Sequence, residues 1–153
     1  MLCLVLKKIT DVDIRRGTEA GKGCGTHTVL VAETAGFTMS GISIDNSSNY
    51  AVLGYELTDC KFNDLRITGG WDGIHIRGGE SVNVSECDFS TGDDCMAGGY
   101  WHNMVIDRCR FNSSCNGLRM IMPSEDVRIS DCAFIGPDDR DDICTDNVFR
   151  LKR

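Results

Sequence analysis

The sequence predicts an all-β chain that folds as a right-handed, single-stranded parallel β-helix of about six to seven coils. Two observations predict this fold: an apolar pattern recurs about every 22 residues, and the spacing within each copy alternates as in a strand. One strand per copy cannot bury its apolar face alone, whereas stacked copies can. The handedness follows from the crossover rule for parallel strands. We therefore expect like residues of successive coils to stack about 4.8 Å apart.

The recurring template reads apolar, x, apolar, x, x, Cys, x, Phe. Its four copies are Tyr55, Leu57, Cys60, Phe62; Val82, Val84, Cys87, Phe89; Met104, Ile106, Cys109, Phe111; and Val127, Ile129, Cys132, Phe134. Aliphatic side chains fill weaker copies in residues 37–44 and 9–14. Glycine-rich and polar segments separate the copies, as turns do. The four cysteines are most simply a ladder of buried thiols that pack as small apolar groups.

A second series of short strands lies between the template copies. Its members begin at Asp72, Asp94, Asn116 and Asn147. The third residue of each is apolar and should point inward, so the fourth should point outward. The fourth positions hold His75, Ala97, Arg119 and Arg150. This register places carboxylates and cations on one external sheet, and the polar first residues can also cap backbone groups at the corner.

The composition indicates one folded domain over residues 1–153, because 41% hydrophobic content and only 2 prolines disfavour disorder. The formal net charge of −7 disfavours a nucleic-acid partner. No apolar run reaches the roughly 20 residues that span a bilayer, which disfavours a membrane partner. The first eight residues carry charge too early for a signal peptide and are typical of a strand interior. We therefore expect a domain truncated at both ends.

Nine cysteines fit no zinc signature, because no Cys-x-x-Cys occurs and histidine is scarce. Oxidising export and a reduced ladder both stay open, and Cys95 and Cys115 could pair on neighbouring coils. The acidic segment 136–143 is interpreted as a solvated turn, with calcium binding as the alternative.

Three segments resemble motifs of the polygalacturonase-type glycoside hydrolases, family 28, a family that carries four such motifs. Residues 92–94 read Gly-Asp-Asp as in that family, Asp72 matches the aspartate of its Asn-Thr-Asp motif, and residues 150–152 resemble its Arg-Ile-Lys motif. The remaining motif departs, because Asn116 stands where the family has histidine. The resemblance covers roughly residues 37–152. It implies a pectin-lyase-like β-helix from an uncharacterised bacterial relative, located outside the cell or in the periplasm.

Hydrolysis of a glycosidic bond with inversion gives the carboxylates a use. One protonated carboxyl donates its proton to the leaving oxygen, and an ionised carboxylate about 6.5–9.5 Å away activates a water molecule. Crowding of three aspartates should raise the pKa of at least one. The resemblance implies that Asp93 is the general acid and that Asp72 and Asp94 hold the water. It also implies that Arg150 and Lys152 bind the substrate carboxylate.

Further residues are candidates for substrate binding. Arg119 and His75 share the outer column and could line subsites, or they could be ordinary exposed strand residues. Asn116 keeps a hydrogen bond but cannot carry the charge of the family's histidine. Aromatic side chains that could stack on sugars or pack at corners are Trp71, Tyr100 and Trp101.

These observations predict a glycosidase that hydrolyses an acidic, pectin-like polysaccharide or oligosaccharide. We expect no metal or other cofactor and a monomeric full-length protein, although a truncated chain could be inactive. Two alternatives stay open. One is a calcium-dependent polysaccharide lyase, and the other is a non-catalytic β-helix that binds carbohydrate or serves as a structural stalk.

Overall fold

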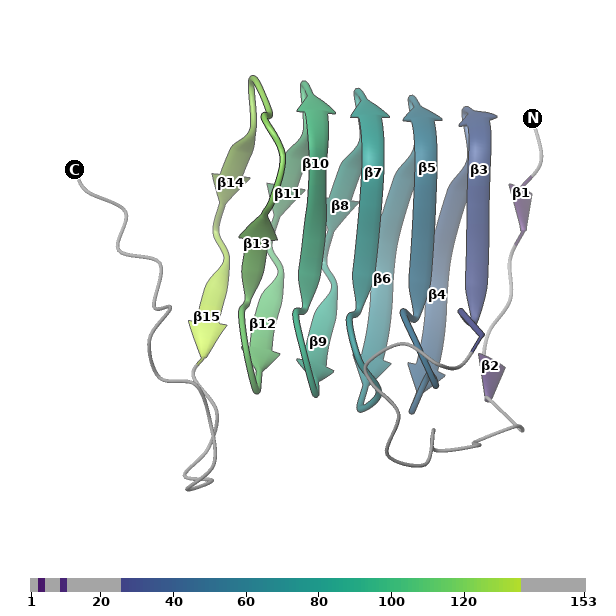
Figure 1. Cartoon of the computed structure of the whole chain (residues 1–153), viewed down its shortest axis with the longest axis vertical. Coiled ribbons are helices and arrows are strands. Elements are labelled where there is room, and N and C mark those ends of the chain that lie inside the picture. The colour runs from purple at the N-terminus through teal and green to yellow at the C-terminus, as the bar shows by residue number, and fades with distance from the viewer. Residues whose placement is uncertain (1–2, 5–8, 11–25, 136–153) are drawn as a thin grey trace.

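A computed structural model describes residues 3–4, 9–10 and 26–135 of the chain. This part is a column of parallel strands in which each coil lies beside the next along one axis (Figure 1). The front sheet takes one strand from each of five coils: β3 (Val29–Ala35), β5 (Val52–Thr58), β7 (Ile74–Glu80), β10 (Met96–His102) and β13 (Leu118–Met120). The described residues form no helix long and apolar enough to cross a membrane.

The back sheet begins with two long strands, β4 (Thr38–Asp45) and β6 (Lys61–Thr68). In later coils it divides into pairs: β8 (Asn83–Ser85) and β9 (Asp88–Thr91), β11 (Val105–Asp107) and β12 (Arg110–Ser113), β14 (Arg128–Ser130) and β15 (Ala133–Ile135). The break falls at Glu86, Arg108 and Asp131, whose φ angles are 56°, 48° and 50°. A left-handed residue therefore bends each of these coils at the same place.

Two short strands, β1 (Cys3–Leu4) and β2 (Ile9–Thr10), pair in parallel with β4. The described column has five coils, fewer than the six or seven predicted. The prediction also counted coils in residues 1–25 and 136–153, of which the structure describes only residues 3–4 and 9–10.

The front-sheet register confirms the second predicted series. Met96 pairs with Ile74 on one side and Leu118 on the other. Ala97 likewise pairs with His75 and with Arg119. The third residues are buried, at 0% exposure for Ile74 and Met96 and 6% for Leu118, so the fourth residues point out of the column as predicted.

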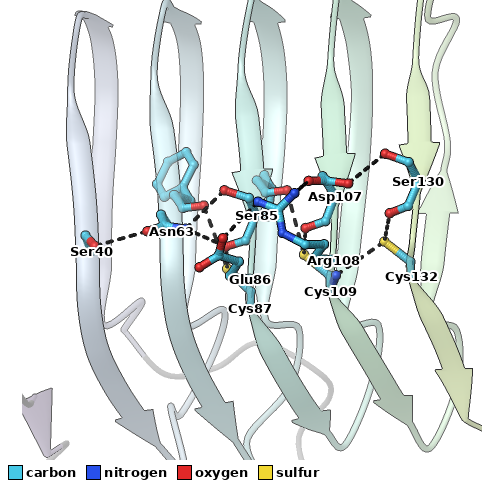
Figure 2. Close-up of polar contacts among 12 residues, drawn as sticks. Ser40, Asn63, Ser85, Glu86, Cys87, Asp107, Arg108, Cys109, Ser130 and Cys132 are labelled. Carbon is cyan, nitrogen blue, oxygen red and sulfur yellow. Dashed lines mark hydrogen bonds and ion pairs between the residues drawn. The ribbon is translucent and has the colours of Figure 1, made fainter.

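The interior contains phenylalanine and cysteine ladders built from the last three template copies, as predicted for those copies. The ring of Phe111 stacks on Phe89 at 5.2 Å between centroids and on Phe134 at 4.9 Å. Cys87 and Cys109 are each 2% exposed, and Cys132 follows them in the next coil (Figure 2). A hydrogen bond with Cys109, together with burial, raises the pKa of the Cys87 thiol. Cys95 and Cys115, which could have paired, are free thiols, as are Cys60, Cys87, Cys109 and Cys132.

The first template copy was placed in the wrong register. Lys61 pairs with Asn83 and Phe62 with Val84, so Cys60 lies beside Val82 and not beside Cys87. The predicted partners of Cys60 in that copy, Tyr55 and Leu57, belong to front strand β5. Because cysteine packs as a small apolar group, it suits more than one inward position, and its recurrence alone does not define the register.

A polar ladder runs along the outer face of the back sheet, with one residue from each coil (Figure 2). Asn63 donates to the Ser85 hydroxyl 22 residues later at 3.1 Å, and Ser130 donates to Asp107 at 2.7 Å. Arg108 pairs with Asp107 and with Glu86. These back-sheet carboxylates therefore have a neighbouring cation.

Candidate active site

The three predicted carboxylates converge on one cleft. It lies at the corner where strands β7, β10 and β13 begin, and these strands are neighbours in the front sheet (Figure 1). Asp72, Asp93 and Asp94 all line this cleft, whose volume is about 210 Å³. Their exposed fractions are 6%, 7% and 2%. The cleft therefore contains acidic groups that are largely removed from water, which is costly unless they are paired or used.

The backbone places these residues one above another. The Gly73 amide donates to the Asp94 carbonyl at 2.9 Å, and the Cys95 amide donates to the Asn116 carbonyl at 2.9 Å. A side chain at Gly73 would collide with the Cys95 carbonyl oxygen of the next coil, so glycine permits this close stacking. The predicted stacking of Asp72, Asp94 and Asn116 at one corner is confirmed.

Asp94 is the most buried of the three carboxylates. Asn116 Nδ2 donates to its Oδ1 at 2.6 Å, and Arg119 Nη1 lies 3.4 Å from its Oδ2. Burial raises the pKa of Asp94, and the negative charges of Asp72 and Asp93 act in the same direction, while Asn116 and Arg119 oppose them. The predicted rise in the pKa of at least one aspartate is confirmed, although burial contributes more than crowding.

Asp72 is held by His75, whose Nδ1 lies 2.9 Å from Asp72 Oδ2. His75 points out of the column as predicted, yet it is only 4% exposed. The reason is Tyr50, whose ring stacks on the imidazole at 4.5 Å between centroids and 9° between planes. Arg77 Nε donates to the other ring nitrogen at 3.3 Å.

Sequence reasoning missed Tyr50 and Asn49, which also line the cleft. The repeat carried a signal for them, because Tyr50 stands one coil before Asp72 at the same corner, where the Ala51 amide donates to the Asp72 carbonyl. The repeat template was defined by the inward apolar residues and did not include the corner residues of the coil that precedes Asp72.

The remaining candidates have different positions. The side chain of Arg119 is 53% exposed beside Asp94, and Trp71 lines the cleft. Trp101 is 1% exposed and donates from Nε1 to the Ile76 carbonyl, so it is a core residue. Arg150 and Lys152 lie outside the described residues.

One group in the described residues has the spacing of metal ligands. Ligand atoms of Asp93, Asp94 and Cys115 lie within 4.8 Å of one another. Calcium takes about six to eight oxygen ligands, whereas a thiolate suits softer metals. Two carboxylates and a thiol are therefore a mixed set that does not match the calcium site of the lyase alternative.

Residues 27–136 match the family described as a right-handed beta helix region. The chain belongs to this family, which confirms the predicted fold and its handedness. Comparison with curated proteins and with solved structures finds no match.

Proposed function

We propose that the protein hydrolyses glycosidic bonds of an acidic, pectin-like polysaccharide with inversion at the anomeric carbon. The observation that carries this proposal is the convergence of Asp72, Asp93 and Asp94 in one cleft, each at most 7% exposed. Burial of neighbouring acids costs folding free energy. Clusters of this kind in an accessible cleft are typical of sites that use the proton affinity of their members.

The contacts of Asp94 oppose the rise in its pKa that burial causes, and the contact of Asp72 with His75 orients the Asp72 carboxylate. Asp72 lies 2.9 Å from His75 Nδ1, and Asp94 accepts from Asn116 at 2.6 Å. A carboxylate that accepts hydrogen bonds is stabilised in its charged form. These contacts support the role that the resemblance implies for Asp72 and Asp94, which is to orient and activate a water molecule. Asp93 then donates its proton to the leaving oxygen.

The cations beside the cleft support an acidic sugar as the substrate. Arg77 and Arg119 both line the cleft, and a guanidinium binds a carboxylate through two parallel hydrogen bonds. Trp71 presents an aromatic ring at the same cleft, where it can contact the apolar face of a sugar. Arg150 and Lys152 remain predicted contributors on the resemblance alone. A polymeric substrate favours action outside the cell or in the periplasm.

The test is an assay of reducing ends on a panel of acidic and neutral polysaccharides. Substitution Asp93→Asn should lower kcat by roughly 10²- to 10⁴-fold, which is the contribution of a general acid. Asp107→Asn is the matched control, because Asp107 lies on the back sheet beside Arg108 and Ser130. The anomeric configuration of the first product, read by NMR, should be inverted. Unchanged turnover in Asp93→Asn would remove Asp93 from the mechanism.

The same assay separates the alternatives. Unsaturated products that absorb in the near ultraviolet and vanish with a chelator would indicate a lyase. Oligosaccharide binding without any release of reducing ends would indicate a non-catalytic β-helix.

A further inference from the structure

We propose that Arg77 and His75 form a positioning pair that fixes the orientation of the Asp72 carboxylate. The part of this inference that concerns turnover rests on the proposed function. The part that concerns the histidine proton rests on the contacts alone.

The first step is the location of the proton on His75. Arg77 Nε carries a hydrogen at every accessible pH and can only donate. It lies 3.3 Å from His75 Nε2, which must therefore be the acceptor. A neutral imidazole with an accepting Nε2 carries its hydrogen on Nδ1. That hydrogen points at Asp72 Oδ2, 2.9 Å away.

The second step is the rigidity of the ring. Tyr50 stacks on His75 nearly parallel, and the ring of His27 stacks on Tyr50 at 4.9 Å from one coil further down. These contacts leave His75 4% exposed, so the imidazole cannot turn away from Asp72. The stack and the two hydrogen bonds together hold the ring from its face and from both nitrogens.

The third step is the consequence for Asp72. A fixed donor keeps one carboxylate oxygen of Asp72 in a hydrogen bond and thereby holds the other oxygen in a fixed direction. This arrangement suits a group that must orient a water molecule. Other charged or titratable groups around this arrangement are Asp93 and Asp94 from the next coil, Arg119 from the coil after it, His27 from the preceding coil, and Tyr55, whose ring lies under Arg77. Because Arg77 occupies Nε2, His75 does not shuttle a proton. It acts through Asp72 and is a positioning residue.

The tautomer is tested by nitrogen NMR on protein labelled at the histidine rings. The chain has 3 histidines, so substitutions of His27 and His102 assign the signals. We expect a protonated Nδ1 and an unprotonated Nε2 for His75. Arg77→Met should remove the donor and admit the other tautomer. A protonated Nε2 in the unaltered protein would overturn the inference.

The effect on Asp72 is tested with two substitutions that separate the ring of His75 from its hydrogen-bond donor. His75→Phe keeps a ring to stack on Tyr50 but has no donor, whereas the amide nitrogen of His75→Asn can take the place of Nδ1. We expect His75→Phe to lower kcat by roughly 10- to 100-fold, as loss of a supporting hydrogen bond does elsewhere. His75→Asn should recover most of the loss, because its amide can restore the donor to Asp72.

The control is His102→Phe, because His102 contacts Glu80 outside the cleft and its side chain is 52% exposed. Wild-type kcat in His75→Phe, or no recovery in His75→Asn, would refute the positioning role. If the unaltered protein hydrolyses no polysaccharide, the proposed function fails, and the NMR result alone then decides whether the pair holds Asp72. The NMR result also decides if His75→Phe does not fold.

Discussion

The contact between Arg119 and Asp94 allows a quantitative test of how the cleft holds its most buried carboxyl. Arg119 Nη1 lies 3.4 Å from Asp94 Oδ2. Substitution Arg119→Met removes the positive charge and keeps an unbranched apolar stem. Because the cation favours the ionised carboxylate, its loss should raise the pKa of Asp94 further above the ordinary value, in the direction that burial already drives it.

The size of the shift follows from the separation and the exposure. The Arg119 side chain is 53% exposed whereas that of Asp94 is 3% exposed, so water screens the pair from the guanidinium side only. Coulomb's law at this separation with the dielectric constant of water gives about 1 kcal/mol, and this is the free energy by which the cation favours the ionised carboxylate when the pair is fully screened. The shift should shrink as the salt concentration rises.

NMR of the Asp94 carboxyl carbon measures this pKa without any substrate, and the acid limb of the pH–rate profile reports it in turnover. Ionised Asp94 is needed for water activation in the proposed mechanism, so both midpoints should rise together in Arg119→Met. Arg119→Lys is the control that keeps the charge, and its midpoints should stay near those of the unaltered protein. An unmoved carboxyl midpoint in Arg119→Met would show that this cation does not act on Asp94.

Two further predictions concern stability. Asp94→Asn should abolish hydrolysis yet raise the free energy of unfolding at neutral pH, because the folded chain holds the pKa of this group above its ordinary 3.8 and so binds its proton more tightly than the unfolded chain. The unaltered protein therefore becomes less stable as the pH rises through the pKa of Asp94, so Asp94→Asn should be the more stable protein at about pH 7 and no more stable at about pH 3. Thermal melts of both proteins at the two pH values measure this difference, and equal melting temperatures at about pH 7 would contradict it. Phe111→Ala should cost about 3–5 kcal/mol in urea unfolding, because Phe111 is 1% exposed between two stacked rings. Phe134→Ala, at 49% exposure, is its control, and an equal cost for both would refute the ladder as a buried core.

The sequence predicted the register where residue types recur at the same spacing. Phe89, Phe111 and Phe134 occupy one column, as their repetition indicated. The prediction for Cys60 was wrong because several inward positions accept a small apolar side chain. A repeat is therefore most informative where large side chains must stack on their own kind.

For the candidate site, the sequence likewise predicted the backbone positions but not the side-chain contacts. The coil period placed Asp72, Asp94 and Asn116 at one corner, and the structure confirms it. The period did not reveal that Tyr50 covers His75, or that Arg77 faces the histidine ring. These contacts depend on how far side chains reach along and between coils, which the spacing of Cα positions does not specify.

The amino-acid sequence alone determined that this protein is a stack of parallel coils with acidic residues at one outer corner. A constant repeat period places equivalent residues of successive coils next to one another along the column. The tertiary structure decided which of those acids are buried and what holds each one. Burial depends on neighbours from adjacent coils. Asp94 contacts Asn116 and Arg119 of the next coil. Asp72 contacts His75, whose ring stacks on Tyr50 and accepts a hydrogen bond from Arg77. The proton affinity of a carboxyl follows from those neighbours and from its removal from water, and neither is a property of the local sequence.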